Sequence, residues 1–204
     1  MRMISKLLLL PVFVIFFMAA TLSAAPAYVT GNGKACNAST CAVNLPSTNA
    51  GDLIVLGLFV LDSTSVTSVV DTQGNQYTPI GSPQTWSPHN FVERVYYAKN
   101  IKGGTDTATV TLSGSKYMEV RLYEYSGLDT SAPLDAVATP QTGTSTSATT
   151  GTLTTTNSND LLFGFFHSDG SATNFAGPGF NGRTFSIDGY PLGEDKNVTV
   201  AGSY

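Results

Sequence analysis

The chain contains few of the residues on which most enzyme and metal sites depend. Its 204 residues include two cysteines, two histidines and one tryptophan, and charged residues make up only 12%. The two histidines, His89 and His167, are too far apart in the sequence to match a zinc motif. Two thiols without a neighbouring histidine cannot supply four zinc ligands. The sequence therefore gives no support for a zinc site.

Signatures of three further function classes are missing. No Gly-x-Ser-x-Gly elbow is present, so serine hydrolase chemistry has no support. No glycine-rich phosphate loop follows a strand and opens a helix, which argues against nucleotide binding. The chain has 10 Lys and Arg against 14 Asp and Glu, for a net charge of −4, and forms no basic stripe. We therefore expect neither a nucleic-acid partner nor an anionic-membrane partner.

No apolar run reaches membrane-spanning length. The longest, Leu7–Ala20, has about 14 residues, whereas a spanning helix needs roughly 20. Arg2 and Lys6 precede it and small residues follow, as in a secretory signal peptide. We predict a signal peptide over residues 1–25 in preference to a membrane anchor. The candidate cleavage positions follow Ala24, Ala25 and Ala27. The mature protein is then extracellular and makes no membrane contact.

Export favours a disulfide between Cys36 and Cys41, because the compartment outside the cell is oxidising. The loop that it closes is short, so the bond removes little entropy from the unfolded chain. We expect a local clip near the N-terminus. The spacing is not Cys-x-x-Cys, which argues against a redox role.

The rest of the chain shows short strands separated by turns, and no helical periodicity with caps. Thr, Val, Tyr, Phe and Ser dominate the strands, whereas Gly, Asn, Asp and Pro punctuate them. The pattern predicts an all-β fold of two packed antiparallel sheets, a jelly-roll-like β-sandwich with nine or ten strands. Asp52–Leu61 is continuously apolar and reads as a central strand buried on both faces.

Two strand pairs and one loop are predicted with it. Residues 65–70 and 76–80 flank the turn at 71–75 as a hairpin. Residues 152–156 and 160–167 form a second pair. Residues 81–90, with two prolines, form a loop that carries Trp86 and His89.

Residues 26–204 are expected to form a single domain. A Ser/Thr/Gly-rich stretch, 141–150, is interpreted as a connection within it, and a linker between two domains is the alternative. The chain stops at Tyr204, just after a strand-like run, which predicts a domain lacking its last strand, with an unpaired sheet edge.

Several segments, in their order and spacing, resemble uncharacterised β-sandwich modules of secreted bacterial proteins. The matching segments are residues 51–55, 69–71, 74–77, 96–101, 124–129 and 159–164. The resemblance covers roughly residues 50 to 204 and implies a lectin-like or immunoglobulin-like sandwich on an exported protein. It implies no activity and no site residues.

Glycoside hydrolysis needs two carboxylates that face one cleft. Glu119 and Glu124 are five apart on one predicted strand, so they point to opposite faces. Glu93 and Glu119 could face one cleft only if their two strands were adjacent and in the right register. We interpret these charges as solvent-facing, with Arg94 and Arg121 as cross-strand partners. No catalytic residue and no cofactor are predicted.

Calcium is the one ion that the sequence leaves open. Asp71 and Asn75 flank one turn, and Asp129 and Asp135 bracket another. Oxygen-rich loops can hold Ca²⁺. Asp and Asn also favour turns for their own sake, and neither loop has the spacing of a known calcium loop. We favour the turn interpretation.

The aromatic residues provide the remaining signal. Trp86 is followed closely by Phe91, Tyr96 and Tyr97, and a rigid apolar ring face suits stacking on sugars. The alternative is that these rings fill the core. The predicted ligand-binding residues are Trp86, His89, Asn90 and Tyr97.

We therefore expect a secreted, non-catalytic binding module for a polysaccharide or cell-surface glycan. A structural or adhesive spacer is the alternative, and a glycoside hydrolase using Glu93 is the third candidate.

Overall fold

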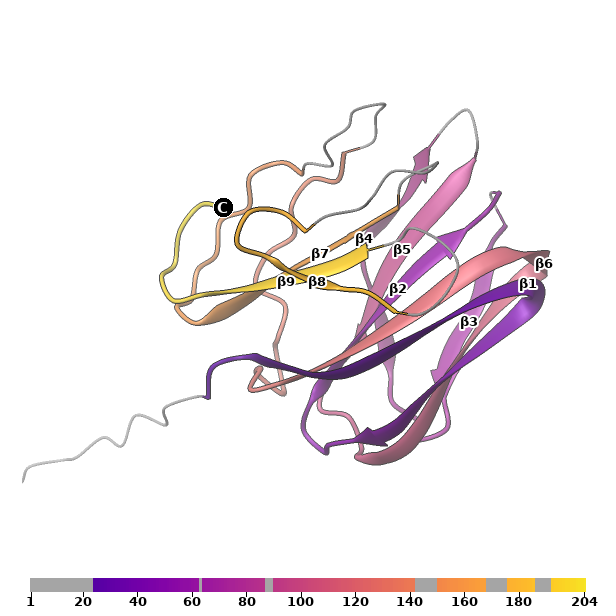
Figure 1. Ribbon diagram of the computed structural model, residues 1–204, viewed down its shortest axis with the longest axis horizontal. Coiled ribbons are helices and arrows are strands. Elements are labelled where there is room, and N and C mark those ends of the chain that lie inside the picture. The colour runs from indigo at the N-terminus through magenta and orange to yellow at the C-terminus, as the bar shows by residue number, and fades with distance from the viewer. Residues whose placement is uncertain (1–23, 63, 87–89, 142–149, 168–175, 186–191) are drawn as a thin grey trace, which may run out of the picture.

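A computed structural model describes residues 24–62, 64–86, 90–141, 150–167, 176–185 and 192–204. Over these residues the fold is all-β, with two antiparallel sheets of six and three strands and no helix (Figure 1). The larger sheet contains β1 (Ala27–Thr48), β2 (Leu53–Val60), β3 (Val66–Asp71), β4 (Tyr77–Trp86), β5 (Phe91–Ala98) and β6 (Gly104–Ser126). The smaller sheet contains β7 (Asp160–Phe166), β8 (Asn181–Arg183) and β9 (Leu192–Val198).

The larger sheet folds over on itself, because its two longest strands each have two arms. The first arm of β1, residues 27–38, pairs with residues 116–126 of β6, and its second arm pairs with residues 104–111. The second arm of β6 also pairs with β2, and its first arm pairs with β3. Figure 1 shows both long strands turning back at the same end of the molecule.

The fold-back encloses an inner core between the two arms. Alternate residues Cys41, Val43 and Leu45 of β1 point into it, as strand geometry requires. Residues of β2, β5 and β6 face them from the other layer, and all eight residues of β2 are buried, as the sequence predicted. The disulfide between Cys36 and Cys41 is confirmed, with 5.7 Å between the Cα atoms. It spans the irregularity at which β1 bends.

The smaller sheet covers the face of β2 and of the second arm of β6 that points away from the inner core. This inter-sheet core consists of buried residues of the larger sheet and the rings that pack on them. Its buried members are Leu53, Val55, Tyr123 and Tyr125, and its partly buried members include Tyr28, Tyr97, Phe163, Phe165 and Phe185. The fold therefore has two apolar layers, and both faces of β2 are used.

Glycines allow rings to approach across the inter-sheet core. A Cβ atom on Gly57 of β2 would overlap the ring of Phe165 in β7. Conversely, a Cβ atom on Gly193 of β9 would overlap the ring of Tyr123 in β6. Each sheet thus offers a gap that an aromatic ring of the other sheet fills.

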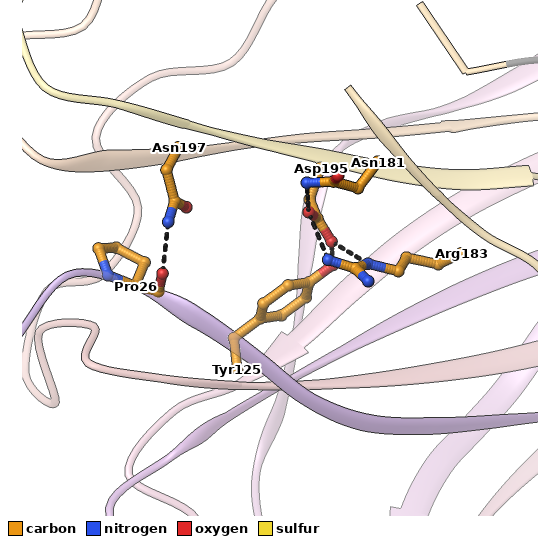
Figure 2. Close-up of polar contacts among 6 residues, drawn as sticks. All are labelled: Pro26, Tyr125, Asn181, Arg183, Asp195 and Asn197. Carbon is orange, nitrogen blue, oxygen red and sulfur yellow. Dashed lines mark hydrogen bonds and ion pairs between the residues drawn. The ribbon is translucent and has the colours of Figure 1, made fainter. Parts of the chain in front are cut away.

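Polar contacts attach the smaller sheet at one end (Figure 2). Asp195 of β9 is only 3% exposed and accepts a 2.8 Å hydrogen bond from the Tyr125 hydroxyl of β6. Arg183 holds the same carboxylate through Nε at 2.6 Å and Nη2 at 2.9 Å. The Asn197 side chain donates to the Pro26 carbonyl at 2.6 Å. The Tyr125 and Pro26 contacts join segments distant in sequence, whereas the Arg183 contact lies within the smaller sheet.

Both predicted strand pairs are wrong. β3 pairs with β6 and β4 with β5, so residues 71–76 carry the chain from one layer to the other. Because each of them pairs with a strand of its own layer, β3 and β4 lie on opposite sides of the inner core. β7 pairs with β9, whereas Thr154 forms a bridge with Ser203. The jelly-roll order of strands stays a prediction.

Candidate functional site

Trp86 lies on a strand and not in a loop, which corrects the sequence prediction. β4 continues to Trp86 after a register shift between Ile80 and Gln84. β4 is the last strand of its sheet, and an edge strand tolerates Pro79 and Pro83 because one side needs no ladder partner. The indole is half-buried and packs against Phe91 of β5, with 5.7 Å between ring centroids.

The other predicted ligand residues do not all gather around Trp86. Asn90 is exposed, has a φ of 55°, and immediately precedes Phe91. His89 lies outside the described residues. Tyr97 is six residues further along β5 than Phe91, about 20 Å at the strand rise. Its ring packs in the inter-sheet core, so the core interpretation holds for Tyr97, and Trp86 and Asn90 remain together.

Two further rings adjoin Phe91, and the sequence analysis did not single them out for the site. Phe59 of β2 packs edge-on against Phe91, with centroids 5.2 Å apart. His167, directly after β7, stacks on Phe59 with centroids 3.7 Å apart. Together Trp86, Phe91, Phe59 and His167 form a ring row across the end of the sheet. His167 thus serves as a packing ring between the two sheets.

Glu93 connects this row to the smaller sheet. It lies opposite Phe59 in the β2–β5 pairing, and its carboxylate accepts a hydrogen bond from the His167 backbone. Its Oε1 atom is buried and has no hydrogen-bond partner in the part of the chain that the structure describes. Burial raises the pKa of Glu93 to about 8, although that backbone hydrogen bond opposes the rise. Glu93 is therefore a mostly neutral acid at pH 7.

Glu119 faces Phe59 from the other side, in β6. The two glutamates are thus two strand spacings apart, about 10 Å between Cα atoms, with Phe59 between them and His167 stacked on its ring. Glu119 is 1% exposed and accepts hydrogen bonds from Tyr117 at 2.7 Å and Arg121 at 3.0 Å. This is a buried ion pair and not an open catalytic cleft.

The solvent-facing interpretation is wrong for Glu119, Arg121 and Glu124, and Glu93 also has a buried carboxylate oxygen. Glu119, Arg121 and Glu124 are all 2% exposed or less. Arg121 bonds along its own strand to Glu119, two residues away on the same face, and not across strands as the sequence predicted. Glu124 points to the opposite face, as predicted, and accepts from the Asn49 backbone at 2.7 Å. Burial raises its pKa to about 7.

Three of the four residues considered for calcium, Asp71, Asn75 and Asp129, serve their own turns. Asp71 accepts from both the backbone and the side chain of Asn75, at 2.9 and 2.8 Å. Asp129 accepts from Ser131 and Ala132, and these hydrogen bonds lower its pKa to about 2. Asp135 instead accepts from the Thr156 backbone, 21 residues away. The contacts of Asp71, Asn75 and Asp129 support the turn interpretation. Across the described ranges no three His, Cys, Asp or Glu residues group as metal ligands.

The surface near Arg94 has a small hollow. Residues 79–83 of the edge strand line it together with Arg94 and Val95, and it has room for about one water molecule. It lies apart from the ring row and offers no volume for a substrate. Among the residues described here, no helix is long and apolar enough to cross a membrane.

Comparison of the chain with protein-family models, curated proteins and solved structures found no match. The all-β, two-sheet architecture is established by the structure itself. Membership in a family of secreted modules remains an inference from the sequence segments quoted above.

Proposed function

We propose that this protein is a secreted, non-catalytic binding module whose ligand is a carbohydrate, either a polysaccharide or a cell-surface glycan. The observation that carries this proposal is the pairing of Trp86 with Phe91 at the free edge of the larger sheet. Both rings are half-buried, so each keeps part of its surface at the solvent boundary.

The neighbourhood of this pair suits a sugar. Leu61, directly after β2 and two residues from Phe59, is an apolar residue that is 42% exposed. Asn90 is exposed next to Phe91 and supplies amide donors and an acceptor. An apolar ring face bordered by an amide matches the alternating apolar and hydroxyl surfaces of a pyranose. A glycoside hydrolase is less well supported, because Glu119 is already committed to Arg121 and Tyr117.

Retention of the purified protein on insoluble cellulose, chitin, starch and cell-wall glycan tests the proposal. We expect selective retention on one of them, competed by its soluble oligomer. Trp86→Ala should abolish retention while leaving the circular dichroism spectrum unchanged. Tyr204→Ala is the matched control. Tyr204 is an aromatic residue that is 42% exposed, and its backbone pairs with Leu153 and not with the strands that carry Trp86 and Phe91.

A structural or adhesive spacer is the second candidate. The filled inter-sheet core favours it, because rings from both sheets occupy the space in which a sandwich would otherwise hold a ligand. If folded protein is retained on none of the four polysaccharides, the carbohydrate proposal is wrong and the spacer function is supported. If folded Trp86→Ala is retained as well as the original protein, the assignment of Trp86 to the binding site is wrong.

A further inference from the structure

Two Asn-Gly sequences lie on edge strands of the described structure. Asn32-Gly33 is in the first arm of β1, at the edge of the larger sheet, and Asn181-Gly182 is in β8, at the edge of the smaller sheet. Glycine carries no Cβ, so its backbone nitrogen can approach the preceding side chain more closely than that of any other residue.

The geometry at the two sequences differs. The Gly33 nitrogen donates to Asn32 Oδ1 at 2.9 Å, so the nitrogen lies against the carboxamide of the preceding residue. The Asn32 amide Nδ2 donates to the Asn44 carbonyl at 2.7 Å, which fixes the orientation of the carboxamide. By contrast, Asn181 turns its Nδ2 toward Asp195 Oδ1 at 3.3 Å. No hydrogen bond from Gly182 to Asn181 exists in this described segment.

We propose that Asn32-Gly33 is a self-modification site, at which the folded protein converts Asn32 to aspartate and isoaspartate through a cyclic imide. Hydroxide removes the Gly33 amide proton, and the nitrogen attacks Cγ of Asn32. The new N–Cγ bond replaces the Cγ–Nδ2 bond, and Nδ2 takes a proton from water and leaves as ammonia. A second water then opens either carbonyl of the ring. The conversion needs no oxidant, reductant or cofactor.

At Asn32 the attacking nitrogen is held beside the carboxamide, in contact with Oδ1, which is bonded to the reacting Cγ. A nucleophile held beside its target avoids part of the entropic cost of reaching it, so we expect this site to react faster than Asn181. This advantage exists only in the folded chain, because unfolding frees both Asn-Gly sequences equally. Fold-dependent selectivity is therefore the signature of the proposed site.

Conversion would remove a tether between the two arms of β1. The Asn32–Asn44 hydrogen bond joins residues twelve apart on either side of the bend, and the disulfide joins the same arms closer to it. The product has a carboxylate facing the Asn44 carbonyl, where a donor stood before. Isoaspartate also inserts a methylene into the backbone opposite Leu122. The Cys36–Cys41 disulfide then joins the two arms of β1 without the Asn32–Asn44 hydrogen bond.

The test is incubation of the full purified protein in mildly alkaline buffer, followed by peptide mapping with mass spectrometry that localises each conversion. We expect Asn32 to convert several-fold faster than Asn181 in the folded protein, and the two rates to converge in urea. Rates that are equal in the folded state, or a faster Asn181, would overturn the proposal.

Two variants separate the chemistry from the structural consequence. Asn32→Gln keeps the amide but requires a larger ring, so residue 32 should stay unmodified. Asn32→Asp copies one product, and we expect it to lower the melting temperature and speed hydrogen exchange at Val43 and Leu45 relative to fresh protein. Continued conversion in Asn32→Gln at residue 32 would contradict the mechanism, and unchanged exchange in Asn32→Asp would contradict the role of the tether.

Discussion

The Tyr125 hydroxyl of the larger sheet donates a hydrogen bond to Asp195 Oδ2 of the smaller sheet, with 2.8 Å between the oxygens, and both residues are buried. The carboxylate also accepts two hydrogen bonds from Arg183 (Figure 2). Arg183 in turn lies over the Tyr28 ring of β1, with its guanidinium carbon 4.0 Å from the ring centroid. One carboxylate therefore orients two groups that attach the smaller sheet to the larger one.

Removing the charge at this point should weaken the fold. We expect Asp195→Asn to lower the free energy of unfolding by about 2–3 kcal/mol, because Arg183 loses its charged partner in a partly buried site. Tyr125→Phe should cost about 1 kcal/mol, the usual value for one hydrogen bond. Urea titration measures both. Tyr204→Phe is the control, since its hydroxyl bonds to Val200 at the surface. Equal effects in all three variants would show that the inter-sheet position of Asp195 confers no special stability.

The glycines under aromatic rings give a second test. Gly57→Ala and Gly193→Ala should each destabilise by about 1–3 kcal/mol, because the added methyl group overlaps the ring of Phe165 or Tyr123. Gly114→Ala is the matched control, since nothing lies within 4 Å of the added atom. Thermal unfolding measures the difference. A loss at Gly114 as large as at Gly57 would mean that the backbone freedom of glycine, and not the ring contact, sets the cost.

The stability of the protein should depend on pH through Glu93. Its pKa rises from 4.5 to about 8 on folding, because burial disfavours the carboxylate. Between these values the folded chain holds a proton that the unfolded chain has lost, so stability falls as pH increases. The stabilisation that depends on this proton is fully present below pH 4.5, and the free energy of unfolding stops falling above about pH 8. Glu124, with a pKa raised to about 7, adds to the same trend.

Replacing Glu93 isolates its share of this trend. Glu93→Gln should flatten the fall in unfolding free energy between about pH 5 and 8, leaving the part due to Glu124. The measurement is urea unfolding at a series of pH values. An unchanged slope in Glu93→Gln would show that Glu93 is ionised in the folded protein.

The local pattern of the sequence was sufficient for the architecture in its coarse form. The unbroken apolar run of β2 predicted a strand buried on both sides. In β1 the alternating residues Cys41, Val43 and Leu45 lie on one face. Both patterns follow from the two-residue period of a strand. The short separation of Cys36 and Cys41 likewise made their disulfide predictable.

Strand partners could not be read in the same way. Residues 71–76 have the composition of a hairpin turn, yet they pass over the end of the inner core and join two layers. Turn chemistry fixes where the chain reverses, but not whether the flanking strands pair with each other. That choice depends on the burial that each layer gains, which involves β5 and β6 far along the chain.

The candidate site divides along the same line. Trp86 and Asn90 could be chosen as candidates from the sequence, because a lone tryptophan near turn residues stands out by itself. Phe59 and His167 were not, because they meet Phe91 only when the second sheet folds over the first. The sequence by itself determined the all-β class, the burial of β2 on both faces and the disulfide, since each depends on residues close together in the chain. Only the tertiary structure decided that Tyr97 lies in a core and that Glu119 and Arg121 are buried, because the sheet that covers them comes from residues more than 30 positions further on.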